Sequence, residues 1–447
     1  MMHQSSNALF YVDPLAMLMI ALVSFVGYCV GSFSYRYLQG DSQFRSFFAQ
    51  LVLLIFSALI MVSANQLILV WGAWCMSNAL LVRLMIHKAS WKAARASGTL
   101  AAKNYLFGAF CMAIAFVLLY WQNRDTNIQM LIHQNHRSPL LLLALILMVI
   151  AAMTQSAIYP FHRWLISSLN SPTPASALMH AGIVNGGGLI LTRFAPLFLQ
   201  YRGLLTVIFI IGLVTALLGT LWKLIQNDVK RMLACSTMGQ MGFMMVQCGL
   251  GLFPAAIAHL IWHGLFKAYL FLASGSAAQE KRLDLGYPPQ TCAFICALIC
   301  GTVGSFGFAF ASGQFWVTTN TRLIIMVIAF LAATQFSLPI LRNKTLKHLP
   351  LALILSTVMS FIYGYSVYLI ENAMQPMQLM QPQPLNLFHI AGIILLGFSW
   401  LSILFIRNDN KRGKLPIWML KNYVLALNAS QPHPRTITAH RNQYQNI

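Results

Sequence analysis

Acidic residues are scarce in this 447-residue chain, which holds 8 Asp and Glu against 29 Lys and Arg. Charged residues make up only 8% of the sequence and hydrophobic residues 58%, and the mean hydropathy is +0.68. A soluble domain carries about 25% charged residues, so the composition excludes a soluble protein and predicts an integral membrane protein. The basic residues lie between apolar runs rather than on a polar module, so we expect no nucleic-acid partner.

Cysteine pairs with metal-binding spacing are also missing. None of the 8 cysteines forms a CxxC pair, and all lie in apolar runs, where cysteine packs as a small apolar residue. Cys292, Cys296 and Cys300 recur every four residues, which leaves a metal or redox face as the alternative to packing. Nucleophile elbows, P-loops and dinucleotide fingerprints are absent as well. We therefore expect no enzyme active site in this chain, with no catalytic residue, no resident metal and no cofactor.

Long apolar runs fill the sequence instead. Each is close to the roughly 20 residues that a membrane-spanning helix needs. The runs are continuous rather than alternating, which leaves a helical bundle. The predicted fold is all-α, a polytopic bundle of about thirteen transmembrane helices. The predicted spans are 14–35, 46–64, 66–86, 104–121, 139–158, 173–197, 203–225, 229–250, 255–275, 290–312, 321–341, 350–371 and 386–406.

Basic residues divide unevenly between the two sides of this bundle. If the N-terminus is outside, most Lys and Arg fall on inside loops and span ends. The positive-inside rule then places the N-terminus in the periplasm and the C-terminus in the cytoplasm, in a bacterial inner membrane. No basic stretch precedes the first apolar run, so we expect no cleavable signal peptide. Residues 1–407 are predicted to form the bundle, and residues 408–447 a loosely ordered basic cytoplasmic tail.

Polar side chains interrupt the apolar spans between residues 155 and 276. An ionised side chain at a bilayer centre costs roughly 2.5–3.5 kcal/mol on insertion scales, so such residues are expected to serve ion movement. His259, His263 and Lys267, at i, i+4 and i+8, predict one polar stripe along a helix. Because His and buried Lys can exchange protons near neutral pH, the stripe is interpreted as a proton relay. The predicted proton or cation pathway comprises His180, Lys223, Asp228, Lys230, His259, His263 and Lys267.

Other interpretations of these residues stay open. The stripe could serve interhelical hydrogen bonding, with Lys267 extending to an interface. His259 and His263 could bind zinc as an i, i+4 pair, although no third ligand is evident. Lys230, with Asp228 and Arg231, could be an ordinary cluster of loop charges.

Proline and glycine mark predicted helix breaks. Pro160 directly follows an apolar run, and Pro172 and Pro174 open the next span, where proline is well tolerated. Gly186–Gly188 lie inside a span, and GTVGSFGFAFASG (301–313) is a second glycine-interrupted segment. Paired broken segments predict inverted repeats of the kind found in transporters.

Four stretches carry a resemblance to a known family. They are SAIYPFHRWL, SPTPASALMHAG, QNDVKRMLACSTMGQMGF and HLIWHGLFKAYLFLASGS. They resemble the antiporter-like subunits of respiratory complex I and of Mrp cation/proton antiporters, most of all the NADH-dehydrogenase subunit 5 type. The family core would cover residues 139–276. The resemblance implies that the proton path runs through His180, Lys230, His259, His263 and Lys267.

Three departures narrow the resemblance. Gln155 stands where the family usually has Lys, Trp71-Gly72 where it has Trp-Glu, and 301–313 lacks the family's Lys. Taken together, these departures and the stretch PFHRWLISSLNSPTPASALMHAGIVNGGG give the chain a resemblance to the DabB membrane subunits of DAB inorganic-carbon transporters. That family works with a large soluble partner, DabA, which has a carbonic-anhydrase-like zinc site. The resemblance implies that H+ or Na+ flow through this chain drives CO2 hydration to bicarbonate by a DabA-like partner, and that the zinc belongs to that partner.

Two other functions stay open. The chain could be a pump or antiporter subunit of a complex I-like, hydrogenase or Mrp assembly, although the missing Glu and Lys argue against it. It could also be a non-conducting scaffold that only anchors a partner.

Overall fold

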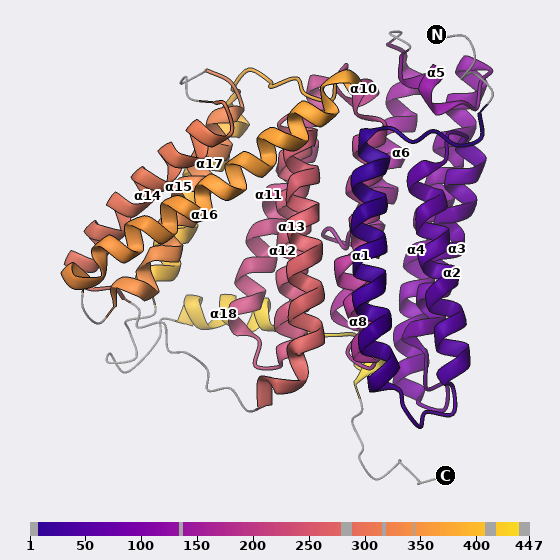
Figure 1. The fold of residues 1–447 in the computed structure, drawn as a ribbon, viewed down its shortest axis with the longest axis horizontal. Coiled ribbons are helices and arrows are strands. Elements are labelled where there is room, and N and C mark those ends of the chain that lie inside the picture. The colour runs from indigo at the N-terminus through magenta and orange to yellow at the C-terminus, as the bar shows by residue number, and fades with distance from the viewer. Residues whose placement is uncertain are drawn as a thin grey trace.

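A computed structural model describes residues 8–133, 137–278, 288–314, 319–342, 345–406 and 417–437. Over these ranges the chain is helical, and its only extended pairings are isolated backbone bridges. The prediction of an all-α fold is confirmed. Figure 1 shows a bundle of upright helices, α1 to α13, with a tilted group, α14 to α17, beside it.

The helices in the first half of the chain are α1 (Pro14–Tyr37), α2 (Phe44–Ser63), α3 (Leu67–Met85), α4 (Lys92–Asn123), α5 (Ile128–Ile132), α6 (Pro139–Gln155), α7 (Arg163–Ile166), α8 (Thr173–Ala181), η1 (Ile183–Asn185), α9 (Gly186–Arg193) and α10 (Ala195–Phe198). The remainder are α11 (Arg202–Ile225), α12 (Val229–Gly249), α13 (Phe253–Leu272), η2 (Ala273–Ala278), α14 (Thr291–Ala311), α15 (Arg322–Leu341), α16 (Thr345–Met374), η3 (Gln375–Met377), α17 (Leu387–Ile406), α18 (Ile417–Ala429) and η5 (Pro434–Thr436).

Several helices begin at side chains that cap them. Asp13 Oδ1 accepts a hydrogen bond from Ala16 N at 2.7 Å, and Pro14 follows it at the first helical position of α1. Ser138 caps α6 in the same way, followed by Pro139. Such side chains satisfy backbone N–H groups that no helical carbonyl can reach. Local sequence therefore determines where these helices start.

Eleven helices of the described residues are long and apolar enough to cross a membrane. Two predicted spans fall outside that group. The helix α6 has only 17 residues, and α12, with 21 residues, carries several polar side chains along its length. The chain is thus a multi-pass membrane protein, and the exact count of thirteen spans stays a prediction. The described chain enters at the upper end of the bundle and finishes at the lower end (Figure 1), as an odd number of crossings requires.

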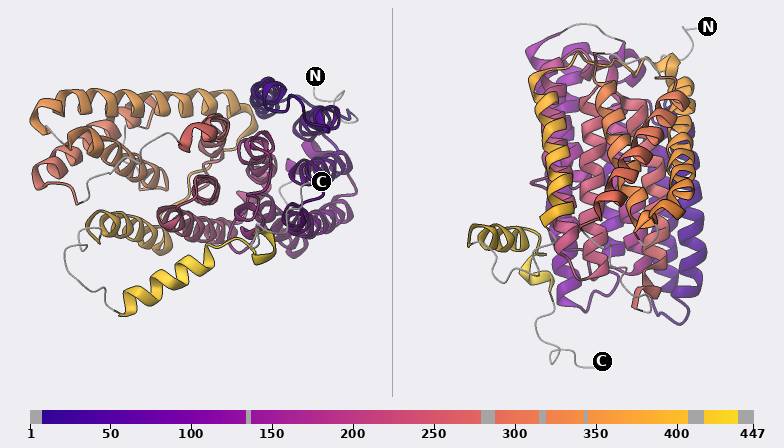
Figure 2. Two further views of the ribbon diagram at one scale, coloured as in Figure 1. Left: turned by 90° about the horizontal axis from the view of Figure 1, so that it is seen from below. Right: turned by 90° about the vertical axis from the view of Figure 1, so that its left-hand side faces the viewer.

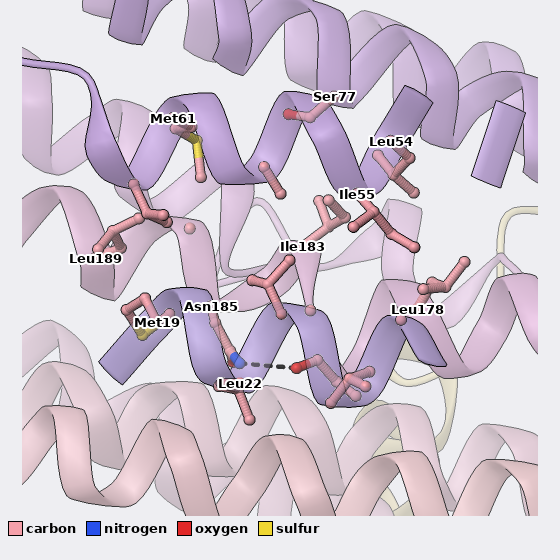
Figure 3. A pocket seen from close by; sticks show the side chains of 18 of the residues that line it. Met19, Leu22, Leu54, Ile55, Met61, Ser77, Leu178, Ile183, Asn185 and Leu189 are labelled. Carbon is pink, nitrogen blue, oxygen red and sulfur yellow. Dashed lines mark hydrogen bonds between the residues drawn. The ribbon is translucent and has the colours of Figure 1, made fainter. Parts of the chain in front are cut away.

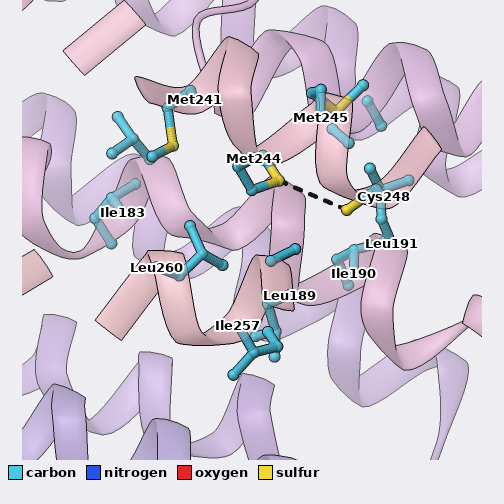
Figure 4. Packing of buried hydrophobic residues seen from close by; sticks show 14 of the residues in the cluster. Ile183, Leu189, Ile190, Leu191, Met241, Met244, Met245, Cys248, Ile257 and Leu260 are labelled. Carbon is cyan, nitrogen blue, oxygen red and sulfur yellow. Dashed lines mark hydrogen bonds between the residues drawn. The ribbon is translucent and has the colours of Figure 1, made fainter. Parts of the chain in front are cut away.

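Methionines and small residues fill the core where α9, α12 and α13 meet. Figure 4 shows Met241, Met244 and Met245 of α12 packed against Ile183 and the residues of α9. A methyl group added at Gly188 would lie 2.7 Å from the sulfur of Met244. Flexible methionine side chains fill the irregular space around a broken helix. This packing holds the interrupted span between the two helices that carry the polar residues.

The glycine-rich segment 301–313 does not break a helix, which corrects the prediction. The helix α14 runs unbroken to Ala311, and Gly313 follows its end with a positive φ of 67°. A methyl group added at Gly304 would lie 2.8 Å from the Cβ of Ala333 on α15. These glycines therefore allow close helix packing, and the inverted-repeat relation remains a prediction.

The C-terminal tail is more ordered than predicted. Residues 417–437 contain α18 and η5, and these elements pack against the lower end of the bundle. Figure 2 shows α18 lying across the direction of the upright helices. The expectation of loose order is therefore wrong for residues 417–437, while 408–416 and 438–447 lie outside the described residues.

Candidate functional site

The predicted polar stripe of α13 faces the inside of the bundle. His259, His263 and Lys267 are only 8%, 5% and 1% exposed. The rings of His259 and His263 stack with their centroids 6.0 Å apart. The side chains of Trp262, Phe266 and Tyr269 are exposed on the same helix. The helix α13 thus has a polar stripe toward protein and an apolar surface suited to lipid.

Thr237 of α12 connects His180 to Lys267. Its hydroxyl donates to the Leu233 carbonyl at 3.0 Å and lies 3.0 Å from Nδ1 of His180. With the hydroxyl proton assigned to the Leu233 carbonyl, Nδ1 of His180 is the donor, and Nε2 of a neutral ring is the acceptor. Nζ of Lys267 donates to the same carbonyl at 3.2 Å. His180 and Lys267 are therefore joined through one hydroxyl and one carbonyl.

The side chain of His263 contacts the backbone of α8. Nε2 of His263 lies 3.2 Å from the His180 carbonyl oxygen, which can only accept. Nε2 therefore carries the proton, and Nδ1 of neutral His263 is the acceptor. Nε2 of His259 is buried and has no hydrogen-bond partner among the described residues. The structure thus brings His180, His259, His263 and Lys267 into one buried cluster, which we call the polar cluster.

Lys230 lies at the lower end of this cluster, one loop away. Its side chain is half-buried, and Nζ donates to the Ser171 carbonyl at 3.1 Å, just before α8 begins. Lys223 and Asp228 are exposed, and Asp228 caps α12 by accepting from Arg231 N at 2.8 Å. Of the seven predicted pathway residues, five therefore line one buried side of the bundle. Lys223 and Asp228 lie on its surface, and the local role of Asp228 is that of a helix cap.

The three predicted proline breaks occupy the ends of helices. Pro160 lies in the turn between α6 and α7, Pro172 immediately precedes α8, and Pro174 lies in its first turn. The span that starts there is interrupted again after Ala181, where η1 separates α8 from α9. A break inside a membrane frees carbonyl groups that need internal partners.

Side chains bind the carbonyls freed at this break. Gln155 Nε2 donates to the Ile183 carbonyl at 3.2 Å, and Ser156 Oγ donates to the Val184 carbonyl at 2.6 Å. Asn185 Nδ2 donates to the Ala181 carbonyl at 2.9 Å. His263 of α13 binds the His180 carbonyl, so side chains from the end of α6 and from α13 both bind carbonyls at the break.

A glycine makes this close approach feasible. A methyl group at Gly187 would lie 2.5 Å from the Ala152 carbonyl oxygen and 2.3 Å from Ser156 Oγ, distances that real side chains do not tolerate. Gly187 therefore lets α9 lie directly against the end of α6, within reach of the Ser156 hydroxyl.

Two side-chain amides, those of Asn78 and Gln155, bind each other next to the break. Asn78 Nδ2 donates to Gln155 Oε1 at 3.0 Å, and Gln155 Nε2 donates back to Asn78 Oδ1 at 2.9 Å. Both side chains are buried. Gln155 is the position at which the resemblance expects Lys, so a neutral contact to α3 stands where that resemblance leads one to expect a cation. Asn78 was not predicted, because no sequence spacing links α3 to α6.

A cavity of about 50 Å³ lies beside the break, among α1, α2, α3, α8 and α9 (Figure 3). Its walls are mostly apolar, with Ser77, Gln155 and Asn185 as polar exceptions. Oδ1 of Asn185 is buried without a partner among the described residues. A space of this size has room for a few water molecules, and the break turns a polar edge toward it.

The zinc alternative for His259 and His263 gains no third ligand among the described residues. Within the described ranges, no group of three or more His, Cys, Asp or Glu side chains is placed to hold a metal ion. The ring stacking of His259 and His263 and the contact of His263 with a carbonyl instead suit hydrogen bonding and proton exchange.

Comparisons with known proteins identify the family of this chain. The profile of the family described as "NADH:quinone oxidoreductase/Mrp antiporter, TM" matches residues 64–287, and that of "NADH-Ubiquinone oxidoreductase (complex I), chain 5 N-terminus" matches residues 3–48. The first profile covers the broken span and α13, and so the whole polar cluster.

Individual relatives give finer similarities. The chain is 41% identical over 288 residues to the probable inorganic carbon transporter subunit DabB1 of Halothiobacillus neapolitanus, covering 62% of this chain and 51% of that protein. It is 38% identical over 286 residues to the probable inorganic carbon transporter subunit DabB of Bacillus subtilis, covering 61% and 55%. The chain thus spans about half the length of these curated relatives.

A solved structure shares the fold. The Mrp complex from Dietzia sp. contains a chain that superimposes with a TM-score of 0.66 over 96% of this chain and 53% of that one, at 20% identity. The antiporter-like fold expected from the sequence is confirmed by this likeness and by the helical architecture. The chain therefore belongs to the NADH:quinone oxidoreductase/Mrp antiporter family of membrane proteins, and its similarity to DabB subunits lies within that family.

Proposed function

We propose that this chain conducts protons, or Na+, across a bacterial inner membrane as the membrane subunit of an inorganic-carbon uptake complex. One observation carries the conducting role. Four proton-exchanging side chains are buried together, and Lys267 and His180 are joined through the Leu233 carbonyl and the Thr237 hydroxyl. Burying such groups in a membrane protein costs free energy, so their presence favours a role in ion movement.

The proposed route enters or leaves near Lys230 and passes through Lys267 and His180 to His263 and His259. Nε2 of His180 and Nδ1 of His263 can each take up a proton. The Leu233 carbonyl accepts from both Lys267 and Thr237, so in this proposal water beside these groups carries the proton between Lys267 and His180. His259 Nε2, which lacks a partner among the described residues, would exchange its proton with water. Lys223 and Asp228 serve as charged groups at the surface end of the route rather than as steps within the membrane.

The inorganic-carbon role is supported by two features. DabB subunits are among the similar proteins, and the neutral Asn78–Gln155 pair departs from the charged pattern of complex I and Mrp subunits. In this proposal a large soluble DabA-like partner holds zinc and hydrates CO2, and ion flow through this chain drives that reaction. The N-terminus would lie in the periplasm and the C-terminus in the cytoplasm.

The conducting role is tested by ion flux. The chain, with its partner, is reconstituted into liposomes that contain a pH-sensitive dye, and a proton gradient is imposed with or without Na+. Lys267→Ala and His263→Ala should each abolish most of the flux and the bicarbonate-independent growth of a host that lacks its own carbon uptake. If both variants retain full flux, the route has been placed wrongly.

A second candidate is a subunit of a complex I-like, hydrogenase or Mrp assembly, which the matching family profile favours. Purification of the tagged chain in mild detergent separates the two. A single large soluble partner that contains zinc supports inorganic-carbon uptake. Flavin or iron–sulfur subunits, or several small membrane subunits without zinc, support the second candidate.

A further inference from the structure

Residues 417–437, here called the C-terminal strap, cross the end of the bundle at which Lys230 lies. The strap consists of α18, a short turn and η5. Figures 1 and 2 show α18 beside the lower part of α11 and α12, across their direction, and the strap continuing toward the lower end of α8. The matching family profiles, over residues 3–48 and 64–287, do not include it.

One half of the strap binds the loop between α11 and α12. Gln226 Nε2 donates to Ser430 Oγ at 2.8 Å. Arg231 Nη1 donates to Gln431 Oε1 at 3.2 Å. Ala426 of α18 packs against a small buried apolar cluster formed by Ile166, Trp222, Cys235 and Met238. The strap is thus fixed on both sides of Asp228, directly beside Lys230.

The other half binds the loop between α7 and α8. His433 N donates to Ser167 Oγ at 2.9 Å, and Asn170 Nδ2 donates to the Thr436 carbonyl at 2.8 Å. Asn170 is adjacent to Ser171, whose carbonyl accepts the hydrogen bond from Lys230. The strap therefore links the two loops that hold the Lys230–Ser171 contact.

Polar side chains are shielded from solvent where the strap meets the two loops. Ser171 and Gln226 of the loops are 2% and 3% exposed, Thr436 of the strap is 2% exposed, and Ser430 of the strap is fully buried. Loops at the end of a membrane bundle ordinarily face water. Their burial here indicates that the strap covers part of the two loops on either side of the Lys230–Ser171 contact.

We propose that the C-terminal strap is a gate on the aqueous entrance to Lys230. Docked, it closes the route between the two loops; released, it lets water and ions reach the Lys230 side chain. The contacts suit a movable element, because α18 has no buried residue and side-chain hydrogen bonds hold the strap to both loops. The proposal rests on the proposed role of Lys230 in ion conduction.

Accessibility of position 230 tests the gate without measuring ion flow. The full chain with Lys230→Cys, in lipid nanodiscs that leave both faces open, is treated with a membrane-impermeant methanethiosulfonate reagent, and adduct formation is followed by intact mass. The chain with native Lys230 corrects for labelling of its own cysteines. Adding Asn170→Ala together with Gln226→Ala should speed labelling of Cys at 230 by about tenfold, because two anchoring hydrogen bonds are lost.

Two further variants guard the interpretation. Gln431→Ala lies on the strap and removes only its bond to Arg231, so it should raise the labelling rate by a smaller factor without touching the bundle. Asn422→Ala, on an exposed position of α18, should leave the rate unchanged. Equal labelling rates in the parent and in both loosened chains would overturn the gate. If labelling responds as expected while Lys267→Ala leaves flux intact, the gate stands as a moving element and the conducting role fails.

Discussion

The upright bundle of α1 to α13 and the tilted group of α14 to α17 differ in how deeply their helices are buried. In the most apolar 18 residues of the broken span Thr173–Arg193, 94% are buried inside the protein, whereas in α17 only 17% are buried. A helix that lies mostly in lipid must satisfy its own backbone, and α14, α15 and α17 run unbroken. Only a helix surrounded by protein can afford an interruption, because neighbouring side chains then bind the freed carbonyls.

This difference explains why the polar cluster lies where it does. The break after Ala181 is held by Gln155, Ser156 and His263, side chains from two neighbouring helices. The same enclosure shields His180 and Lys267 from lipid. The helix break and the buried ionisable side chains therefore both depend on one feature, a helix that other helices surround on all sides.

The largest expected effect contrasts two threonines with the same local bond. Thr237 on α12 and Thr302 on α14 each donate to the carbonyl four residues earlier, at 3.0 Å. Only Thr237 also contacts a histidine. Thr237→Val keeps the shape but removes the link between His180 and Lys267, so proton flux in liposomes should fall by about tenfold or more. Thr302→Val should leave flux unchanged, and equal losses in the two variants would mean that Thr237 acts only through packing.

The next effect contrasts two ion pairs. Arg193, at the end of α9, pairs with Asp13 and also donates to the Val62 carbonyl, and the paired side chains are 4% and 2% exposed. Arg322 pairs with Glu371 at 3.3 Å in the tilted group, where the side chains are 28% and 24% exposed. Arg193→Ala leaves a buried carboxylate unpaired and should cost about 3–5 kcal/mol of stability. Arg322→Ala should cost less than about 1 kcal/mol.

Thermal unfolding in detergent, followed by tryptophan fluorescence, measures both changes. The double variant Asp13→Asn with Arg193→Met tests the mechanism, since it removes both charges and should be more stable than Arg193→Ala alone. If Arg193→Ala and Arg322→Ala unfold at the same temperature, the two regions do not differ in how tightly their ion pairs are enclosed.

A smaller effect contrasts two glycines. A methyl group at Gly187 would clash with α6, whereas nothing lies within 4 Å of the position that it would take at Gly397 on α17. Gly187→Ala should destabilise the protein by about 1–3 kcal/mol, because α9 must move away from the Ser156 hydroxyl. Gly397→Ala should stabilise α17 by about 0.5–1 kcal/mol, since alanine is the better helix former. The same unfolding measurement reports both, and a neutral Gly187→Ala would show that the break is loosely packed.

The sequence predicted those parts of the site that depend on local spacing. His259, His263 and Lys267 follow from helical periodicity alone, and Pro172 and Pro174 from helix-start rules. Thr237 had a weaker signal, because it lies seven residues after Lys230 and so on the same side of α12. Asn78 had none, since its partner Gln155 comes from another helix.

Two predictions failed for identifiable reasons. The glycines of 301–313 suggested a break, yet glycine also serves close helix contact, and only the position of Ala333 and its neighbours decides between the two. The tail from 408 was judged by its average polarity, which hid the apolar stretch IWMLKNYVLALNA that forms α18. In both cases the missing information was what lies opposite the segment in space.

The smallest expected effect concerns the lower loops of the upright bundle. Asp41, after α1, accepts from Gln43 N at 2.8 Å and pairs with His87, after α3, at 3.1 Å. The backbone hydrogen bond from Gln43, and then the bond to His87, hold the pKa of Asp41 below its ordinary value of 3.8. A carboxyl whose pKa is lowered by folding adds stability above its unfolded pKa, and that stability is lost as the pH falls through the folded pKa. Asp41→Asn should therefore lower the unfolding temperature slightly at pH 7, and the difference should vanish in strong acid. A difference that persists in acid would show that the neutral amide disturbs the loop by its shape, and that charge contributes nothing to joining α1–α2 to α3–α4.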